Sequence, residues 1–385
     1  MINRVILLVI DGFGIGALPD ASDYGDAGTS TLVHLADAVG GLSLPNLEAL
    51  GLGHVAQIKG VRTMGQPDGC FGRLGFASRG KDSLVGYWET CGLVLHESGQ
   101  RYSSEVPVDV VAGFEQALGR KVIGNRAASL RTMLAECGVE HLSSGAPILW
   151  TDGGHTCHVA AHDTVMPMTE LASRCRDARK VISGATAPKR IAAHSFSGTV
   201  GAFMPGIGRK DIVLEPPGET MLDMLNRSGQ IVMGVGKVCD LFSGRGLTKA
   251  FPAVSATAAF DETIAIVGKM PRGLLYVSLD LMPDEPSEAA AAVEGFDRRL
   301  PDLFEKLRVG DALVVTGDHG RDLSRPAKTP TREYVPLLVT GPRLAQGVSL
   351  GTRSTAADLG QTIVDALRAE RLTYGDSFFE ALRSG

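Results

Sequence analysis

Three side chains that commonly bind divalent cations follow two apolar segments at opposite ends of the sequence. Asp11 directly follows the run 5–10, and Asp318 and His319 come just after the run 312–316. Runs that are apolar on both faces are typical of central strands in parallel sheets, where chemistry lies beyond the carboxyl ends of the strands. We therefore expect these side chains to meet at one site. Two carboxylates and an imidazole suit a borderline cation such as Mn²⁺ or Zn²⁺.

A hydroxyl group that could carry a phosphate lies in the segment 80–89. Ser83 follows Lys81 and Asp82 and precedes apolar residues, a pattern typical of a helix N-terminus. Backbone N–H groups and the helix dipole stabilise a phosphate at such a place, which makes Ser83 a candidate nucleophile. The alternative is that the Asp-Ser pair only caps the helix, as these residues often do. The local sequence leaves both interpretations open.

A glycine-rich stretch near the N-terminus resembles a nucleotide-binding motif and has to be distinguished from it. Residues 12–17 match the outline G-x-G-x-x-A of the dinucleotide fingerprint directly after a strand. That motif must run into a helix, whereas Pro19 and the turn-rich segment 20–26 follow here. We therefore predict no dinucleotide site.

Length and composition exclude several classes of protein. The 385 residues are too many for one compact core, which indicates two domains or an inserted domain. A net charge of -5 gives no basic footprint for nucleic acid or an anionic membrane. Six cysteines without a C-x-x-C pair indicate neither a disulfide framework nor a structural zinc site, and no run of about 18 apolar residues could span a bilayer. We expect a cytoplasmic protein that acts on a small molecule, with no nucleic-acid or membrane partner.

The apolar pattern predicts alternating strands and helices. A strand over 274–279, a helix with its apolar stripe between Val293 and Leu307, and the strand 312–316 form one βαβ unit. Earlier, Thr220 can cap a helix that precedes the strand 231–235. These units predict a doubly wound α/β core with a mostly parallel sheet.

The middle of the chain is less regular. It contains six of the nine histidines in polar surroundings: His96, His141, His155, His158, His162 and His194. We interpret residues 96–210 as an inserted, smaller α+β cap domain. The core domain would then be discontinuous and comprise residues 1–95 and 211–385.

Over nearly its whole length the chain resembles the phosphopentomutases, of the alkaline phosphatase superfamily. The stretches that carry the resemblance are 10–20, 44–47, 80–83, 119–125, 234–237, 296–301, 318–320 and 331–336. The resemblance implies the superfamily's α/β core with an inserted cap. It also implies an isomerase that moves phosphate between C1 and C5 of ribose or deoxyribose.

By this resemblance Ser83 stands where the family has a phosphorylated threonine, and a serine hydroxyl can perform the same chemistry. Asp11, Ser83, Asp318 and His319 would line one of two manganese ions, with Zn²⁺ or Mg²⁺ as alternatives. Two such cations about 4 Å apart clamp the attacking and leaving oxygens of an in-line transfer. The reaction would pass through a sugar bisphosphate, which could also act as an activator.

The residues expected around the second cation differ from the family pattern. The family strand that reads Asp-Phe-Asp is followed by Tyr-Gly-His, whereas the corresponding segment 277–286 contains no histidine. The family's other histidine precedes Thr-Arg-Glu-Tyr-Val-Pro, and Pro330 stands there, with no side-chain donor. Asp280 and Asp284 remain as carboxylates for this cation, so the sequence allows one or two ions.

The expected cap also differs from the family. Where the family has an Arg-x-Phe and an Arg-Thr that resemble phosphate clamps, this chain has His194-Ser195-Phe196 and Met204-Pro205. Arginine binds phosphate through a planar fork of two hydrogen bonds, which histidine and methionine cannot reproduce. The candidate substrate-binding residues are Lys81, Lys237, His155, His158, His194 and Arg209.

Three hypotheses from different classes follow from these residues. The first is a phosphomutase that acts on a sugar phosphate or a related small phosphorylated metabolite through phosphorylated Ser83. The second is a diverged phosphatase or other hydrolase with a reorganised single-metal site. The third is a non-catalytic relative that binds a ligand without turnover.

Overall fold

The computed structural model describes residues 2–97, 99–184, 186–326 and 328–383. The chain divides into two compact units, Met1–Glu97 with Pro216–Gly385, and Ser98–Glu215. The segment 96–210, expected to form a cap, falls almost entirely in the second unit. Its action as a cap over the site stays a prediction.

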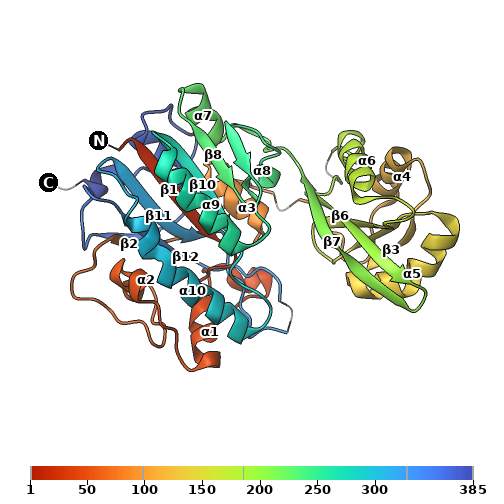
Figure 1. Cartoon of the computed structure of the whole chain (residues 1–385), viewed down its shortest axis with the longest axis horizontal. Helices are drawn as coiled ribbons and strands as arrows, with labels where there is room; N and C mark the ends of the chain where they lie inside the picture. The colour runs from red at the N-terminus through yellow and green to blue at the C-terminus, as the bar shows by residue number, and fades with distance from the viewer. Residues whose placement is uncertain (1, 98, 185, 327, 384–385) are drawn as a thin grey trace. The chain divides into compact units, whose positions relative to one another are not determined.

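The first unit is built on an eight-stranded sheet with the order β13-β2-β12-β11-β1-β10-β8-β9 (Figure 1). β1 (Arg4–Ile10) lies between β10 (Gly273–Leu279) and β11 (Asp311–Gly317) and is parallel to both. The remaining strands are β2 (Cys70–Leu74), β8 (Val232–Val235), β9 (Lys249–Phe251), β12 (Val335–Thr340) and β13 (Ser349–Arg353). β12 runs antiparallel to both of its neighbours, whereas the other pairs are parallel. The predicted mostly parallel α/β core is confirmed.

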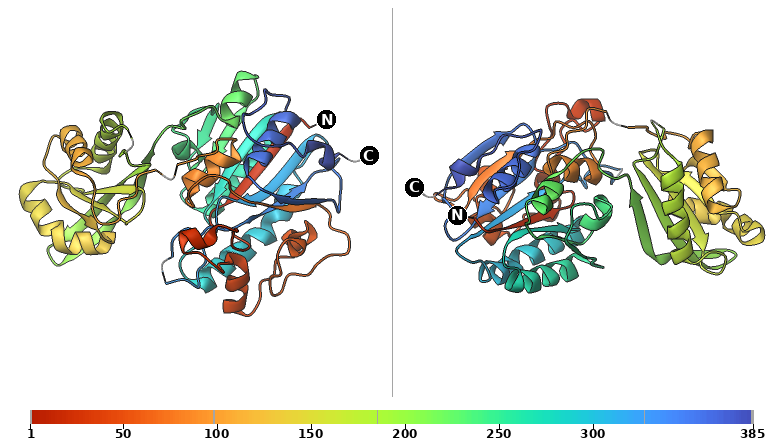
Figure 2. Two further views of the ribbon diagram at one scale, coloured as in Figure 1. Left: turned by 180° about the vertical axis from the view of Figure 1, so that it is seen from behind. Right: turned by 90° about the horizontal axis from the view of Figure 1, so that it is seen from above.

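Helices cover both faces of this sheet because its strands are apolar on both sides. Leu275 and Val277 of β10 join a buried cluster with apolar residues of four helices, α1 (Thr31–Val39), α2 (Pro45–Ala49), α9 (Ala256–Lys269) and α10 (Pro286–Phe304). Side chains alternate along a strand, so Tyr276 points to the opposite face, where it stacks on Tyr87 with 5.4 Å between ring centroids. Figure 2 (left) shows the helices of that second face. They are α3 (Ser83–Thr90), α7 (Met221–Arg227), α8 (Val238–Leu241) and α11 (Ala357–Ala366).

Helix ends follow the sequence signals. Thr220 caps α7 through a capping box with Asp223, as its sequence predicts. α10 begins at Pro286, because proline at the first helical turn loses no hydrogen bond that the helix needs. Short 3₁₀ turns occupy Ala21–Tyr24, Leu52–His54 and Phe379–Leu382.

The second unit has a five-stranded sheet with the order β3-β4-β5-β6-β7, more regular than its sequence indicates. The strands are β3 (Ile123–Ala127), β4 (Ile148–Thr151), β5 (Thr156–His162), β6 (Arg190–Thr199) and β7 (Ala202–Val213). α4 (Val108–Leu118) and α6 (Met168–Val181) pack into one buried cluster, and α5 (Leu130–Ser144) packs into another. Parallel and antiparallel pairs alternate across this sheet, which makes the unit α+β. In the part of the chain described, no helix combines the length and apolarity needed to cross a bilayer.

A buried ion pair joins the beginnings of two central strands. Arg4 and Asp311 face each other in register on β1 and β11, and both are almost fully buried. The guanidinium donates to Asp311 through Nε at 3.1 Å and Nη2 at 2.5 Å. Its Nη1 donates to the carbonyl oxygens of Val267 and Met270 at the end of α9. One side chain therefore ties two strands to a helix end.

We expect Asp311→Ala to lower the free energy of unfolding by about 3–5 kcal/mol, because it leaves the buried Arg4 charge without a partner. Urea unfolding followed by circular dichroism measures the change. Asp261→Ala is the matched control, since Asp261 is 60% exposed and pairs with Arg299 on the surface. That variant should lose less than about 1 kcal/mol. Equal losses in the two variants would contradict the importance of the Arg4–Asp311 pair.

Candidate metal centre

The register of the central strands brings the expected ligands together. Ile10 of β1 lies opposite Leu279 of β10 and Gly317 of β11, so the residues that follow all emerge at one edge of the sheet. Asp11, Asp318 and His319 each offer a ligand atom, and these atoms all lie within 4.8 Å of one another. His319 Nε2 is 3.4 Å from Asp11 Oδ1 and 3.4 Å from Asp318 Oδ2.

Local hydrogen bonds orient these ligands. The Nδ1 atom of His319 lies 2.8 Å from the carbonyl oxygen of Gly320. A carbonyl oxygen can only accept, so Nδ1 is the donor of this bond, and Nε2 is the ring nitrogen that faces the two carboxylates. Gly12 N donates to Asp318 Oδ1 at 3.0 Å, which fixes that carboxylate. Such outer hydrogen bonds set the orientation of metal ligands.

The chemistry of this group fits a divalent cation. Asp318 is fully buried, and its Oδ2 atom has no hydrogen-bond donor among the described residues. A buried carboxylate oxygen without a donor is costly unless a cation compensates it. Two carboxylates with a neutral imidazole are a set that divalent cations bind. We conclude that Asp11, Asp318 and His319 can hold one divalent cation.

The candidate nucleophile adjoins this group. Asp82 is the N-cap of α3, and its side chain accepts from Val85 N at 3.2 Å. Ser83 is the first residue of the helix and is nearly buried, with its Oγ atom 3.0 Å from His319 Nε2. The helix cap and the candidate nucleophile are therefore different residues of the Asp-Ser pair. Asp82 caps the helix, and Ser83 faces the ligands.

Two buried charged residues hold the loop before Ser83. Arg332 donates to the carbonyl oxygens of Phe76, Ser78 and Gly80, at 2.7, 2.8 and 2.8 Å. Glu89 of α3 accepts from Ala77 N and Ser78 N, both at 2.7 Å. The backbone that leads into α3 is therefore fixed by one guanidinium and one carboxylate.

A glycine lets α3 approach the strand end that carries the ligands. A Cβ atom on Gly86 would lie 2.0 Å from the carbonyl oxygen of Asp318 and 3.0 Å from its Cβ. No side chain fits in that space, so glycine is required at this point of the helix. The close contact brings Ser83, one turn earlier, next to His319.

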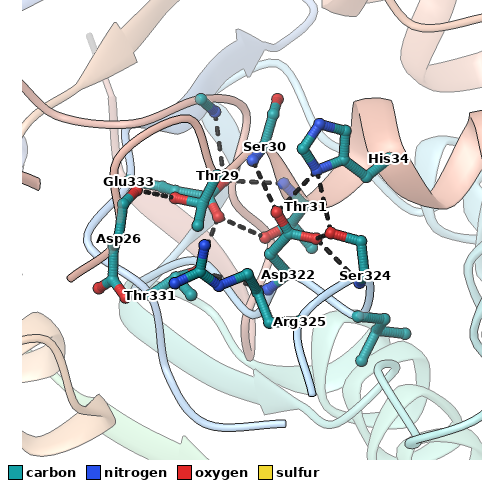
Figure 3. A network of polar contacts seen from close by, with 12 residues as sticks. Asp26, Thr29, Ser30, Thr31, His34, Asp322, Ser324, Arg325, Thr331 and Glu333 are labelled. Carbon is teal, nitrogen blue, oxygen red and sulfur yellow. Dashed lines mark hydrogen bonds and ion pairs between the residues drawn. The ribbon is translucent and has the colours of Figure 1, made fainter. Parts of the chain in front are cut away.

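Two carboxylates hold the segment that follows the ligands against the start of α1, as Figure 3 shows. Asp322 accepts from Ser30 N at 3.1 Å, and Glu333 accepts from Thr31 N at 2.9 Å. Burial tends to raise the pKa of Asp322, but hydrogen bonds from Ser324, His34 and Ser30 bring it below its ordinary value. Burial raises the pKa of Glu333. Acceptors at a helix N-terminus satisfy its free N–H groups, so both carboxylates stabilise α1.

A pocket lies beside Asp318 and His319. One side of the pocket is formed by the loop before α3 and by the first turn of that helix. The other side is formed by the ligands and the segment that follows them. The lining residues are Phe76, Gly80, Lys81, Asp82, Val85, Gly86, Asp318, His319, Thr331, Arg332 and Glu333. Lys81 Nζ pairs with both oxygens of Asp26, at 2.7 and 2.9 Å. Lys81 thus lies at the pocket wall with its ammonium paired to Asp26, and its contact with a substrate anion stays a prediction.

The other expected core residues are placed differently. Lys237 forms an ion pair with Asp11 Oδ2 and so adjoins the ligand group. Asp280 follows β10 but is exposed and does not join the group of three ligands. Asp284 is 66% exposed, and its Oδ1 atom pairs with Arg321 at 2.5 Å.

The expected substrate residues of the second unit form a cluster of their own. His158 Nδ1 lies 3.0 Å from His194 Nε2, and His158 Nε2 lies 3.3 Å from Asp152 Oδ2. Trp150 stacks on His158, with 5.0 Å between ring centroids. Burial, followed by the neighbouring charges of His158 and Arg209, lowers the pKa of His194 to about 3.

Two further residues of that unit are held by local contacts. The Nδ1 atom of His155 lies 2.8 Å from the carbonyl oxygen of Gln100. Arg209 is 44% exposed and pairs with Asp211 at 2.9 Å. Arg209 therefore retains exposed surface for an anionic ligand, whereas His158 and His194 are mostly engaged within the cluster.

Sequence reasoning did not identify three residues that shape the centre, namely Arg321, Arg332 and Glu333. Arg332 and Glu333 belong to the family-like stretch 331–336, so the signal was present in the sequence. Their contacts reach residues more than 200 positions away, which no local pattern reveals. Arg321 directly follows the stretch 318–320, and its partners lie after β10.

We expect Gly86→Ala to weaken divalent-cation binding and to lower thermal stability, by about 1–3 kcal/mol of unfolding free energy, because the added methyl group collides with Asp318. Calorimetric titration with Mn²⁺ and thermal unfolding measure the two effects. Gly268→Ala in α9 is the matched control, since a Cβ there meets nothing within 4 Å. A Gly86→Ala protein that binds cation like the control would contradict the close approach.

The imidazole of His194 should stay neutral as the pH falls through 6, and protonate only near pH 3. Between about pH 6.5 and 3 the unfolded chain would bind a proton that folded His194 does not, so the stability of the second unit should fall with falling pH. NMR titration of the histidine ring signals, assigned with His194→Gln, tests this. A midpoint for His194 near 6.5 would contradict its burial in the cluster.

Comparison with known proteins identifies relatives over the entire chain. A family model described as the Metalloenzyme superfamily matches residues 283–371. The phosphopentomutase of Carboxydothermus hydrogenoformans is 41% identical over 387 residues, which cover 99% of this chain and 100% of that protein. The phosphopentomutase of Alkaliphilus metalliredigens is 38% identical over 384 residues, 98% of each chain.

Among solved structures, Leishmania mexicana phosphoglycerate mutase aligns with a TM-score of 0.47 and 12% identity, over 98% of this chain and 97% of that one. The sequence relatives are far closer. Identity of about two residues in five over nearly the full length of both proteins shows common ancestry, and the chain belongs to the phosphopentomutase family.

Proposed function

We propose that this chain is a metal-dependent phosphomutase that moves phosphate between C1 and C5 of ribose or deoxyribose, with phosphorylated Ser83 as the carrier. The observation that carries the proposal is the position of Ser83. Its Oγ atom lies 3.0 Å from the Nε2 atom of a cation-ligand histidine, at the first residue of a helix. A hydroxyl, a candidate cation site and a helix N-terminus meet there, which supports phosphoryl transfer because that reaction needs a nucleophile and positive charge around the phosphate.

The phosphate would be transferred in two steps. A sugar hydroxyl attacks the phosphorus on Ser83, the bond between phosphorus and Ser83 Oγ breaks, and the hydroxyl proton is transferred to Ser83 Oγ. The resulting sugar bisphosphate then returns its other phosphate to Ser83 Oγ, and the freed sugar oxygen takes the proton. The net result is isomerisation, so a catalytic amount of sugar bisphosphate would also activate an enzyme that has lost its phosphate.

The residues around Ser83 serve this exchange. Asp11, Asp318 and His319 would hold the cation, for which we propose Mn²⁺ because carboxylates and imidazole both suit it. When bound, the cation would supply positive charge that stabilises the phosphoryl oxygens. The N–H groups at the start of α3 point in the same direction as the helix dipole and favour the negative phosphate on Ser83.

Substrate contacts are proposed on two sets of residues. Lys81 at the pocket wall and Lys237 beside Asp11 would attract the phosphate of the substrate from the core. In the second unit we propose His155, His158, His194 and Arg209, with the second unit acting as the cap. Arg209 is the strongest of these, because its guanidinium is partly exposed.

The hydrolase and the non-catalytic binding protein are less well supported. The relatives named phosphopentomutase match the chain from end to end, and the carrier position holds a nucleophilic hydroxyl. We also propose a cytoplasmic location. It is supported by the six cysteines, all of which are free thiols, as is usual in a reducing compartment.

Intact mass spectrometry after incubation with ribose 1,5-bisphosphate or glucose 1,6-bisphosphate should show a single added phosphate on the wild-type protein. Ser83→Ala should take up none and should lose interconversion of ribose 1-phosphate and ribose 5-phosphate, since the carrier oxygen is absent. Ser83→Thr is the matched variant and should keep both properties, because it retains the hydroxyl. Circular dichroism confirms that the variants fold.

Other outcomes of that experiment would contradict the proposal. A phosphate that persists on Ser83→Ala would place the carrier at another residue. Release of free phosphate as the main product of ribose 5-phosphate would identify a hydrolase.

A further inference from the structure

The edge of the sheet that carries Asp11 and Asp318 also carries two cationic side chains. Lys237 follows β8, and Arg321 follows the ligand pair after β11. We infer that the centre binds one divalent cation per chain, and that Lys237 and Arg321 supply the positive charge beside it.

The ligands present fit one cation and do not fit a second. Within the described ranges, Asp11, Asp318 and His319 form the single group of three ligating side chains. The family resemblance implies a second cation, for which Asp280 and Asp284 are the carboxylates at hand. Asp280 is exposed and outside the group, and Pro330 offers no ligand atom at all. A lone carboxylate in solvent is a weak site for a transition metal.

Lys237 occupies the outer oxygen of Asp11. Asp11 turns Oδ1 toward His319 Nε2, at 3.4 Å, and its Oδ2 toward the ammonium of Lys237. The ammonium thus lies at the oxygen of Asp11 that a second cation sharing this carboxylate with the first could otherwise bind. The side chain of Lys237 is 34% exposed and that of Asp11 is 15% exposed, so the pair lies partly out of bulk water, where its attraction is strengthened.

Arg321 occupies the other carboxylate. Its Nη1 atom donates to the carbonyl oxygen of Met282 and its Nη2 atom to Asp284 Oδ1, at 2.5 Å. Its Nε atom donates to the carbonyl oxygen of Lys328 at 3.2 Å. The guanidinium thus binds oxygens of the segment after β10, and it already pairs with Oδ1 of Asp284, which leaves that carboxylate partly neutralised.

The backbone of Arg321 is held firmly, so this placement is built into the fold. Its N–H donates to Thr31 Oγ at 2.7 Å, at the first residue of α1. The next residue, Asp322, accepts from Ser30 N and contacts His34 at 2.7 Å, as drawn in Figure 3. A Cβ atom on Gly12 would lie 2.7 Å from Arg321 Cβ. A residue with a side chain at position 12, beside Asp11, would therefore collide with Arg321.

The positively charged side chains of Lys237 and Arg321 differ from a second metal ion in two ways. They cannot dissociate, so the positive charge would not depend on the metal concentration. They also repel the one bound cation, so the centre should bind it more weakly than its ligands alone allow. The second property gives a test that does not involve turnover.

The first measurement is the metal content of the wild-type protein. After equilibration with excess Mn²⁺ and removal of free metal, elemental analysis should find one equivalent per chain, and Asp318→Asn should find none. Two equivalents in the wild type would overturn the inference. This count does not depend on the reaction proposed above.

The second measurement is the Kd for Mn²⁺ by calorimetric titration. Lys237→Met should bind about tenfold more tightly, because it removes a positive charge from a ligand carboxylate. Arg321→Met should shift Kd in the same direction by a smaller factor, since it contacts no ligand. Lys249→Met is the matched control and should leave Kd unchanged, because Lys249 begins β9 at the opposite end of the parallel strands.

An unchanged or weaker Kd in both folded variants would overturn the role of the two cations. Turnover is read separately, and its interpretation rests on the proposed mutase function. If that function holds, Lys237→Met should lose mutase activity by about tenfold or more at saturating Mn²⁺ although it binds the metal more tightly. Opposite changes in Kd and kcat distinguish a charge contribution from a loss of structure, which would weaken both.

Discussion

The parallel hydrogen-bonded register of β1 with β10 and β11 determines where every charged group of the centre can lie. Ile10 stands opposite Leu279 and Gly317, so three chain segments leave the sheet at the same level. A slip of one residue in either pairing would turn a ligand carboxylate toward the opposite face, because side chains alternate along a strand. The buried Arg4–Asp311 pair at the other end of β1 and β11 opposes such a slip.

The centre combines opposite charges in a small, partly buried space. Asp11 and Asp318 bring two carboxylates, while Lys237 approaches one of them and His319 Nε2 faces both. Asp318 Oδ2 is buried without a hydrogen-bond donor among the described residues, which is costly for a charged carboxylate and which a bound cation would relieve. The same electrostatic field would favour the phosphate on Ser83, so metal binding and the proposed chemistry have a common physical basis.

Positioning of the nucleophile depends on contacts that are distant in sequence. Arg332 and Glu89 hold the loop before α3, and Gly86 allows the helix to touch the carbonyl oxygen of Asp318. None of these residues would bind the cation. Each acts by placing Ser83, which explains why the site extends well beyond its candidate ligands.

Much of the core could be predicted from the sequence because the signals were local. The apolar run before Asp11 and the run before Asp318 specified central strands, and Thr220 specified a helix start. The strands of the second unit were harder to predict from the sequence. β3 is only partly buried, and β6 contains a histidine and several small residues. Both features weaken the apolar alternation that identifies a strand.

The sequence by itself determined the ligand types, the order of the strands along the chain and the membership of the family, because these are properties of residue identity and periodicity. Only the tertiary structure decided that Asp82 caps α3 while Ser83 faces His319, and that Arg321 pairs with Asp284. The reason is physical. Such pairings depend on distances between segments far apart in the chain, and packing of helices against the sheet sets those distances.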